Sequence, residues 1–163
     1  MSTLLIDTDK NALIAKSEVY FTLAERFFDR TFKRAEYLFN QRGKAAGSAH
    51  LQRNLIKFNP ILFQQNQCVF FDQVIPHEVA HLVVFQTYGK VRPHGMEWQS
   101  IMKTIFKIPA LTTHNLNIDD VVGQQFAYAC DCQQHKLTIR CHNKILKGES
   151  YFCKRCQGLL KMC

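Results

Sequence analysis

The chain has 163 residues, 47% hydrophobic and 21% charged, which suits one compact catalytic domain with a small appendage and excludes a disordered chain. Its formal charge of +8 and its pI near 9.2 favour a polyanionic partner. No run approaches the roughly 18–20 apolar residues of a membrane span, and residues 1–10 lack the basic start of a secretory signal, so we expect a cytoplasmic protein with no membrane partner.

The N-terminal third is expected to form a helix and then a hairpin. Apolar side chains recur at three- and four-residue spacing over residues 9–39, a pattern that predicts a helix. Small residues and glycines at 41–47 are unsuited to a helix interior. Two short strands follow at 48–51 and 55–59, and we interpret them as a hairpin.

Helices dominate the next segment. The pair Asn59-Pro60 indicates a helix start, and we expect a helix of about a dozen residues that is broken before Pro76. Residues 76–88 form the strongest predicted helix, with Gly89 just past its end.

The C-terminal half begins with a further predicted helix and ends in a tail rich in cysteine. The helix spans residues 95–106 and is closed by Pro109. Residues 111–125 look irregular, so we predict a main domain over 9–125 and a separate tail over 126–163.

The strongest predicted helix carries an HExxH motif. The four-residue spacing puts His77 and His81 on one face, one turn apart, where both imidazoles can bind a single zinc ion. Glu78 points to a neighbouring face, beside the metal, where it can act as a general base towards bound water. The motif therefore predicts a zinc hydrolase with Glu78 as its catalytic residue.

The third zinc ligand has two candidates. The metzincin pattern is excluded, because Val84 and Thr87 stand where it requires glycine and histidine. Downstream, His94 would complete a three-histidine site and Glu97 a site of two histidines and a carboxylate. Spacing alone favours His94 and leaves both candidates open.

The motif and the run that follows it resemble a known family. His77–His81 followed by Gly89–Trp98, which reads Gly-Lys-Val-Arg-Pro-His-Gly-Met-Glu-Trp, is similar to the SprT family of bacterial zinc metallopeptidases, relatives of the Spartan DNA–protein crosslink proteases. The resemblance extends over Gln41–Gly47, Ile56–Pro60 and the tail, and so over most of residues 18–160.

This resemblance implies a fold, a site and a substrate. It makes His94 the third zinc ligand. It implies an α+β fold, with zincin-like helices packed on a short antiparallel sheet, zinc in a cleft at the sheet edge, and a small C-terminal zinc ribbon. The hairpin at 42–59 would border that cleft, where a substrate backbone could add as a strand. The expected activity is a metalloendopeptidase acting on DNA-bound or DNA-crosslinked proteins.

The tail has the spacing of a second, structural zinc site. Cys132, His135, Cys153 and Cys156 give two ligand pairs, each separated by two residues. Cys130 could replace Cys132, and His142 could replace His135. Residues 136–143 and 144–152 alternate as two strands of a ribbon would. Cys141 is interpreted as a spare thiol, and His50 and His114 as ordinary surface or core histidines.

Most of the excess charge lies in the tail. Residues 127–163 carry seven basic and two acidic side chains, against 14 and 11 in the rest of the chain. Basic side chains interleaved with Tyr151 and Phe152 suit phosphate contacts and base stacking on DNA, single-stranded DNA included. The candidate residues are Lys136, Arg140, Lys144, Lys147, Lys154, Arg155 and Lys161. A merely solvated surface is the alternative, and a non-enzymatic nucleic-acid-binding protein with structural zinc is the rival function.

Overall fold

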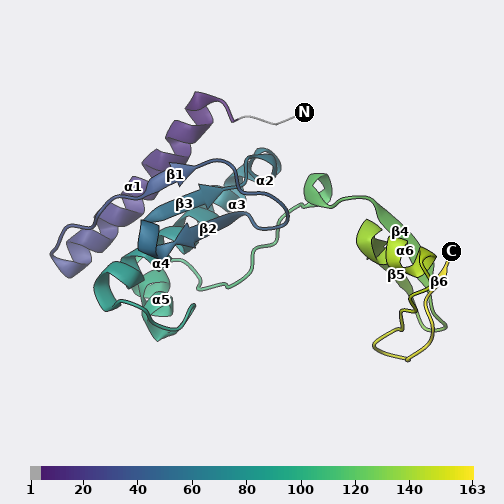
Figure 1. Ribbon diagram of the computed structural model, residues 1–163. Coiled ribbons are helices and arrows are strands. Elements are labelled where there is room, and N and C mark those ends of the chain that lie inside the picture. The colour runs from purple at the N-terminus through teal and green to yellow at the C-terminus, as the bar shows by residue number, and fades with distance from the viewer. Residues whose placement is uncertain (1–4) are drawn as a thin grey trace. The chain divides into compact units, whose positions relative to one another are not determined.

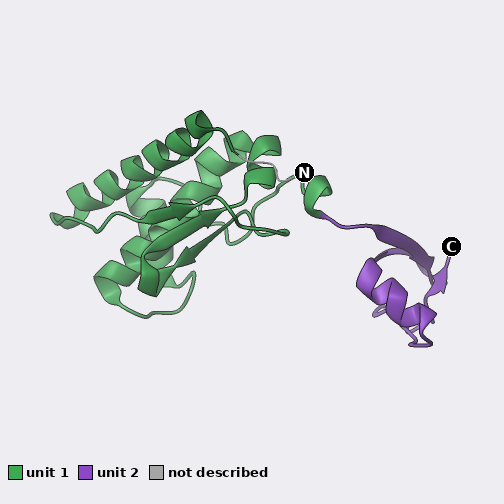
Figure 2. Cartoon of the chain, turned by 45° about the horizontal axis from the view of Figure 1, so that its top comes forward, with its two compact units in different colours: residues 1–121 green, residues 122–163 purple. Residues whose placement is uncertain are grey.

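The computed structural model describes residues 5–163 (Figure 1). Residues 1–4, the start of the segment considered as an export signal, lie outside the described residues. The chain divides into two compact units, the first ending at Val121 and the second spanning Val122–Cys163 (Figure 2). The division falls within the segment predicted to be irregular.

Unit 1 holds a three-stranded sheet in the order β1-β3-β2, formed by β1 (Glu36–Leu38), β2 (Gly47–His50) and β3 (Leu55–Phe58). Strands β2 and β3 are antiparallel, so the predicted hairpin is confirmed. Strand β1, which was not predicted, pairs in parallel with β3. Among the described residues 5–163, strand β2 is therefore an edge of the sheet.

The first helix, α1, spans Asp7–Phe28, and the predicted continuation to residue 39 is wrong. Asp29 adopts a left-handed conformation with φ of 47°, which ends the helix. The chain then turns back, because the guanidinium of Arg34 donates to Glu18 at 2.5 Å and to both carboxylate oxygens of Glu25 at 2.5 and 2.9 Å. This turn directs the chain into β1.

After β3 the chain forms α2 (Pro60–Gln65), α3 (Gln67–Val69), the π-helical turn η2 (Phe70–Val74) and α4 (Ile75–Tyr88). The side chain of Asn59 accepts hydrogen bonds from the first N–H groups of α2, at 3.1 and 3.3 Å, so the predicted start is confirmed.

The predicted break before Pro76 is wrong, because residues 67–88 run as one helix. The N–H of Ile75 bonds to the carbonyl of Phe70, and this wider turn lets the helix accommodate a residue that lacks an N–H. By length and composition the helix could cross a membrane, but 61% of its apolar window is buried in unit 1, as in a core helix.

Helix α4 packs against both α1 and β2, and it forms the centre of unit 1. Its buried side chains meet those of α1 and β3, among them Phe21 and Phe58. The predicted helix at 95–106 is present as α5 (Met96–Ser100) and the π-helical turn η3 (Ile101–Ile105), and its Trp98 is buried in the same core. The helix that bears the HExxH motif is thus fixed on both sides.

Unit 2 contains a second sheet, order β5-β4-β6, and one helix. Its elements are β4 (Gln125–Ala129), β5 (Gln134–Thr138), α6 (Ile139–Leu146) and β6 (Lys161–Met162). Strand β4 is antiparallel to both neighbours. Helices and mostly antiparallel strands lie in separate segments, so the predicted α+β class is confirmed, with the parallel pair β1–β3 as the one departure from the predicted antiparallel sheet among the described residues.

The two strands predicted over 136–152 are wrong beyond Thr138, where α6 begins. The Thr138 side chain caps the helix by accepting a hydrogen bond from the N–H of Cys141. His142 and Ile145, three residues apart, then share one helix face, and both contact the sheet side of unit 2. The packing of this half-buried face favours a helix over the alternating pattern.

Candidate metal centres

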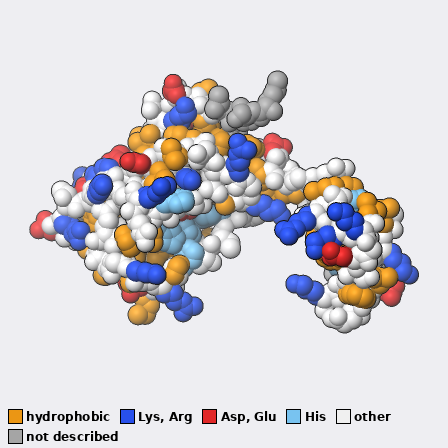
Figure 3. Space-filling model, viewed as in Figure 1, with side chains coloured by type: hydrophobic (Ala, Val, Ile, Leu, Met, Phe, Trp, Pro, Cys, Tyr) orange, Lys and Arg blue, Asp and Glu red, His pale blue; other side chains and the backbone are white. Residues whose placement is uncertain are grey.

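Three histidines of unit 1 converge on one point. His77 and His81 lie one turn apart on α4, and His94 comes from the loop before α5. Their Nε2 atoms form a triangle with sides of 3.1 Å (His77–His81), 3.1 Å (His81–His94) and 3.0 Å (His94–His77). Histidine side chains form a visible patch on this face of unit 1 (Figure 3).

This triangle fits a metal ion better than hydrogen bonds. A neutral imidazole has one N–H, so three Nε2 atoms aimed at one centre cannot all be paired with one another. Three nitrogens at about 2.0–2.1 Å from a tetrahedral zinc would lie about 3.3 Å apart, close to the separations seen here. The three residues could therefore hold a metal and leave one position open.

His94 reaches the other two through a strained turn. It adopts a left-handed conformation with φ of 55°, and the N–H of Gly95 bonds back to the carbonyl of Arg92 at 3.0 Å. A Cβ at position 95 would lie 2.9 Å from that carbonyl oxygen, so only glycine fits without a shift. Glu97, the competing ligand candidate, lies outside the triangle.

The ring of Trp98 packs against all three imidazoles on the core side of the site. Its ring centroid lies 4.8 Å from that of His77, 5.7 Å from His81 and 4.7 Å from His94. Its indole N–H also donates to the carbonyl of His77 at 3.3 Å. Because Trp98 is only 1% exposed, it closes the core side of the site against water.

Burial keeps these histidines neutral, the form in which imidazole binds metals. Burial, reinforced by the charges of neighbouring histidines, lowers the pKa of His77 to about 3 and that of His81 to about 4. The pKa of His94 is also lowered by burial.

Glu78 is a buried carboxylate beside the triangle. It faces the edge strand β2 so closely that a Cβ on Gly47 would lie 3.0 Å from its Cγ and 3.2 Å from its Oε1. Burial raises the pKa of Glu78 to about 8, against a hydrogen bond with the backbone of Ala49 that lowers it. A cation on the three imidazoles would favour the carboxylate form.

Two cavities open onto the site. One, of about 310 Å³, is lined by the loop at 44–47, His77, Glu78, and residues 112–114 and 116. The other, of about 670 Å³, lies on the side of His94 and Glu97. Thr112 lines both, so the segment after Pro109 forms a wall that the two share.

His114, interpreted from the sequence as an ordinary histidine, belongs to this wall. Its ring centroid is 5.0 Å from that of His77. No motif surrounds it in the sequence, so only the fold reveals that it faces the site. His50, the other histidine interpreted as ordinary, lies on β2 with its Nε2 3.4 Å from Ser48 Oγ.

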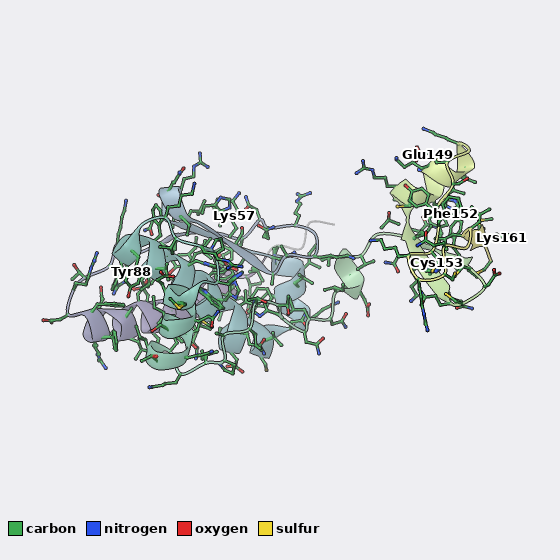
Figure 4. All side chains as sticks on the ribbon, turned by 90° about the horizontal axis from the view of Figure 1, so that it is seen from below. Lys57, Tyr88, Glu149, Phe152, Cys153 and Lys161 are labelled. Atoms are coloured by element: carbon green, nitrogen blue, oxygen red, sulfur yellow. The ribbon has the colours of Figure 1, made fainter. Side chains whose placement is uncertain are left out.

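Unit 2 gathers four thiols, those of Cys130, Cys132, Cys153 and Cys156, within 4.8 Å of one another. The Sγ of Cys132 lies 3.5 Å from that of Cys130 and 3.7 Å from that of Cys153. Four sulfurs at about 2.3 Å from a tetrahedral zinc would be about 3.8 Å apart, so the group fits a closed metal site. Cys153 is buried within unit 2 (Figure 4).

This group contains both Cys130 and Cys132, whereas the sequence suggested one or the other together with His135. The Nε2 of His135 lies 3.3 Å from the Sγ of Cys130, at the edge of the cluster. Burial opposes ionisation of Cys130, but hydrogen bonds with His135 and Cys132 lower the pKa of its thiol to about 5. His135 therefore favours the thiolate that a metal requires.

His142 and Cys141 lie on α6, outside the thiol group. The ring of His142 stacks on Phe126, with centroids 3.6 Å apart, and its Nδ1 is 3.0 Å from the hydroxyl of Tyr128. Its contacts are thus those of a packing residue.

The basic candidates lie on β5, on α6 and at its end, in the turn Cys153–Cys156 (the knuckle), and on β6. Six of them are exposed: Lys136, Arg140, Lys147, Lys154, Arg155 and Lys161. Lys144 is half-buried and pairs with Glu149 at 3.1 Å, so part of its charge is neutralised. Phe152, beside this knuckle, is 56% exposed.

Comparison with known proteins matches both units. The model of the SprT-like family matches residues 17–119, and that of the SprT-like zinc ribbon domain matches residues 124–163. No solved structure matches the chain.

Relatives of similar length extend these matches. A protein named Protein SprT from Vibrio parahaemolyticus is 50% identical over 136 residues, which cover 83% of this chain and 82% of the relative. A Protein SprT from Shewanella oneidensis is 47% identical over 151 residues, 92% of this chain and 97% of the relative. With a clustered set of histidines, a zinc ribbon domain and these relatives, the chain belongs to the SprT-like family.

Proposed function

We propose that this protein is a zinc-dependent metalloendopeptidase that cleaves proteins bound or crosslinked to DNA, in the cytoplasm. One observation carries the proposal: a buried carboxylate, Glu78, stands beside three converging imidazoles, next to the edge strand β2. A purely structural metal site has no need of a base beside an open ligand position.

A zinc ion held by His77, His81 and His94 would supply a Lewis acid and lower the pKa of a bound water towards about 7. Glu78 accepts a proton from the attacking water and later delivers it to the leaving amine. The contact of Glu78 with Gly47 and Ala49 holds the carboxylate in place. The edge strand β2 offers backbone groups along which an extended substrate can pair.

Unit 2 would direct this activity to DNA. A zinc ion on the four thiols would hold the knuckle that carries Lys154 and Arg155. Exposed basic side chains and the exposed ring of Phe152 offer phosphate contacts and a stacking surface. All seven cysteines are free thiols, which agrees with a reducing compartment such as the cytoplasm.

The test is cleavage of a DNA-binding protein by the full chain, with and without single-stranded DNA. We expect cleavage that DNA stimulates, that a chelator stops and that zinc restores. Glu78→Gln should bind zinc normally but lose about 10²–10⁴-fold in rate, because an amide cannot accept the proton. If this variant keeps more than about a tenth of the wild-type rate, Glu78 is not the general base. A wild-type protein that binds zinc and DNA but cleaves nothing would favour the non-enzymatic alternative.

A further inference from the structure

We propose that His114 is a second catalytic residue of this site, whose ring N–H stabilises the oxyanion that forms when a peptide carbonyl is attacked. The inference rests on the proposed peptidase function. It assigns a role to a histidine that has none in the HExxH motif.

The position of His114 suits a group that contacts substrate. It lines the same cavity of about 310 Å³ as His77 and Glu78. Its ring is set edge-on to His77, at 73° between planes and 5.0 Å between centroids. Within residues 5–163, the three-imidazole cluster does not include it. It is therefore not a fourth ligand, but a substrate bound in the cavity that it lines with His77 and Glu78 can contact its ring.

Gln73 orients this ring. The Nδ1 of His114 lies 3.4 Å from the amide oxygen of Gln73, on the π-helical turn one turn before His77. An amide side chain can rotate to present either its oxygen or its NH₂ group. As placed, the amide oxygen faces Nδ1; the proposed role requires the amide rotated by about 180°, so that the NH₂ group of Gln73 donates to Nδ1 and the proton of the neutral ring is on Nε2. The ring then offers an N–H donor on the side away from Gln73.

Glu78 and His114 have different roles in the proposed reaction. Attack of water forms a C–O bond and moves the π electrons of the carbonyl onto its oxygen. Glu78 takes one water proton and gives it to the nitrogen as the C–N bond breaks. His114 keeps its own proton and donates a hydrogen bond, which strengthens as negative charge develops on the oxygen.

The experiment compares two substitutions at one position on a short unstructured peptide, with zinc content measured for each protein. His114→Phe keeps a ring but removes the donor, and it should lower kcat about 10²-fold with KM changed less than about threefold. His114→Gln, the matched control, keeps an N–H donor at similar reach and should recover at least about tenfold of that loss. Both variants should hold as much zinc as the wild type.

A second measurement does not depend on turnover. Binding of a phosphonate peptide, which mimics the tetrahedral intermediate, should weaken in His114→Phe by about the same factor as kcat/KM falls. Binding of an uncleavable substrate peptide should stay unchanged. Gln73→Leu should show a smaller loss of kcat, and it should add nothing in the double variant.

The failures can be told apart. A loss of kcat below about tenfold in His114→Phe, or a zinc loss that parallels it, would overturn this inference while leaving the peptidase standing. If His114→Phe unfolds, Gln73→Leu with the phosphonate peptide decides the same point. A wild-type protein that holds zinc but cleaves no peptide would overturn the proposed function and this inference together.

Discussion

The two units hold their candidate metal ligands in position in opposite ways. In unit 1 a large core fixes α4 and α5, and with them the three imidazoles. In unit 2 the buried core consists of Tyr128, Cys153 and Leu160. One of these three, Cys153, is itself a member of the thiol group.

The comparison indicates that the fold creates the site in unit 1, whereas a metal would create the fold in unit 2. A unit of 42 residues cannot bury enough apolar surface to offset the conformational entropy lost on folding. A bound metal supplies the missing free energy.

The largest expected effect follows from removing metal. A strong chelator should unfold unit 2 and leave unit 1 folded, because structural zinc supplies about 10–16 kcal/mol in small modules. Cys153→Ser should do the same for unit 2 alone and reduce zinc from two ions per chain to one. Amide NMR spectra and elemental analysis measure both. Dispersed unit 2 signals in the chelated protein would contradict the comparison.

A core substitution in unit 1 is the reciprocal test. Phe58 is fully buried between Tyr37, Phe39 and Phe70. Phe58→Ala should lower the free energy of unfolding of unit 1 by about 3–5 kcal/mol. Hydrogen exchange in unit 2 should stay at its wild-type rate. Faster exchange there would show that the two units are not independent.

The third test concerns the ligand loop. His94→Ala should weaken zinc binding by unit 1 more than about 100-fold, which exceeds the cost of losing a supporting residue. Glu97→Ala, three residues away, should retain the ion, because Glu97 lies outside the imidazole triangle. Zinc competition titrations of the two variants measure this. The opposite result would make the site one of two histidines and a carboxylate.

Sequence reasoning succeeded where the chemistry is local. The helix that carries His77 and His81, the hairpin, and the helix after His94 all follow from short-range patterns. It failed where long-range contacts decide. The apolar spacing after Phe28 looked helical, but the pairs of Arg34 with two carboxylates of α1 turn the chain into β1 instead.

The same distinction explains what the sequence did not reveal at the sites. His114 has no local motif, and its approach to His77 depends on how the segment after Pro109 crosses the site. The sequence offered Cys130 and Cys132 as alternatives for one ligand position beside His135, and spacing cannot count how many ligands converge. Only the fold brings four thiols together with His135 beside them.

A smaller effect is expected from the charge of unit 2. Removing residues 122–163 should weaken DNA binding and flatten its salt dependence, because each lost phosphate contact removes about 0.7–0.9 units of log–log slope. Filter binding at several salt concentrations would measure it. Lys144→Ala should change the slope less than Lys147→Ala, since Lys144 pairs with Glu149. An unchanged slope after truncation would mean that the charge is only solvated.

The smallest expected effect is a loss of stability at acid pH, and it too should differ between the two units. Hydrogen bonds with Arg34 and with the backbone of Phe32 lower the pKa of Glu25 to about 2 from 4.5. Because the folded-state pKa is depressed, this stabilisation of unit 1 is present above pH 4.5 and is lost as pH falls towards 2.

With the Arg34 side chain 37% exposed, solvent screening reduces the contribution to about 1 kcal/mol. Glu25→Gln should therefore destabilise unit 1 by about that amount at pH 7 and by little near pH 2. Unit 2 should unfold at a higher pH than unit 1, because protons compete with metal for the thiolates. Urea unfolding of unit 1 and NMR of unit 2 across this range would measure both. If unit 1 unfolded at a higher pH than unit 2, the fold of unit 2 would not depend on a bound metal in the way proposed here.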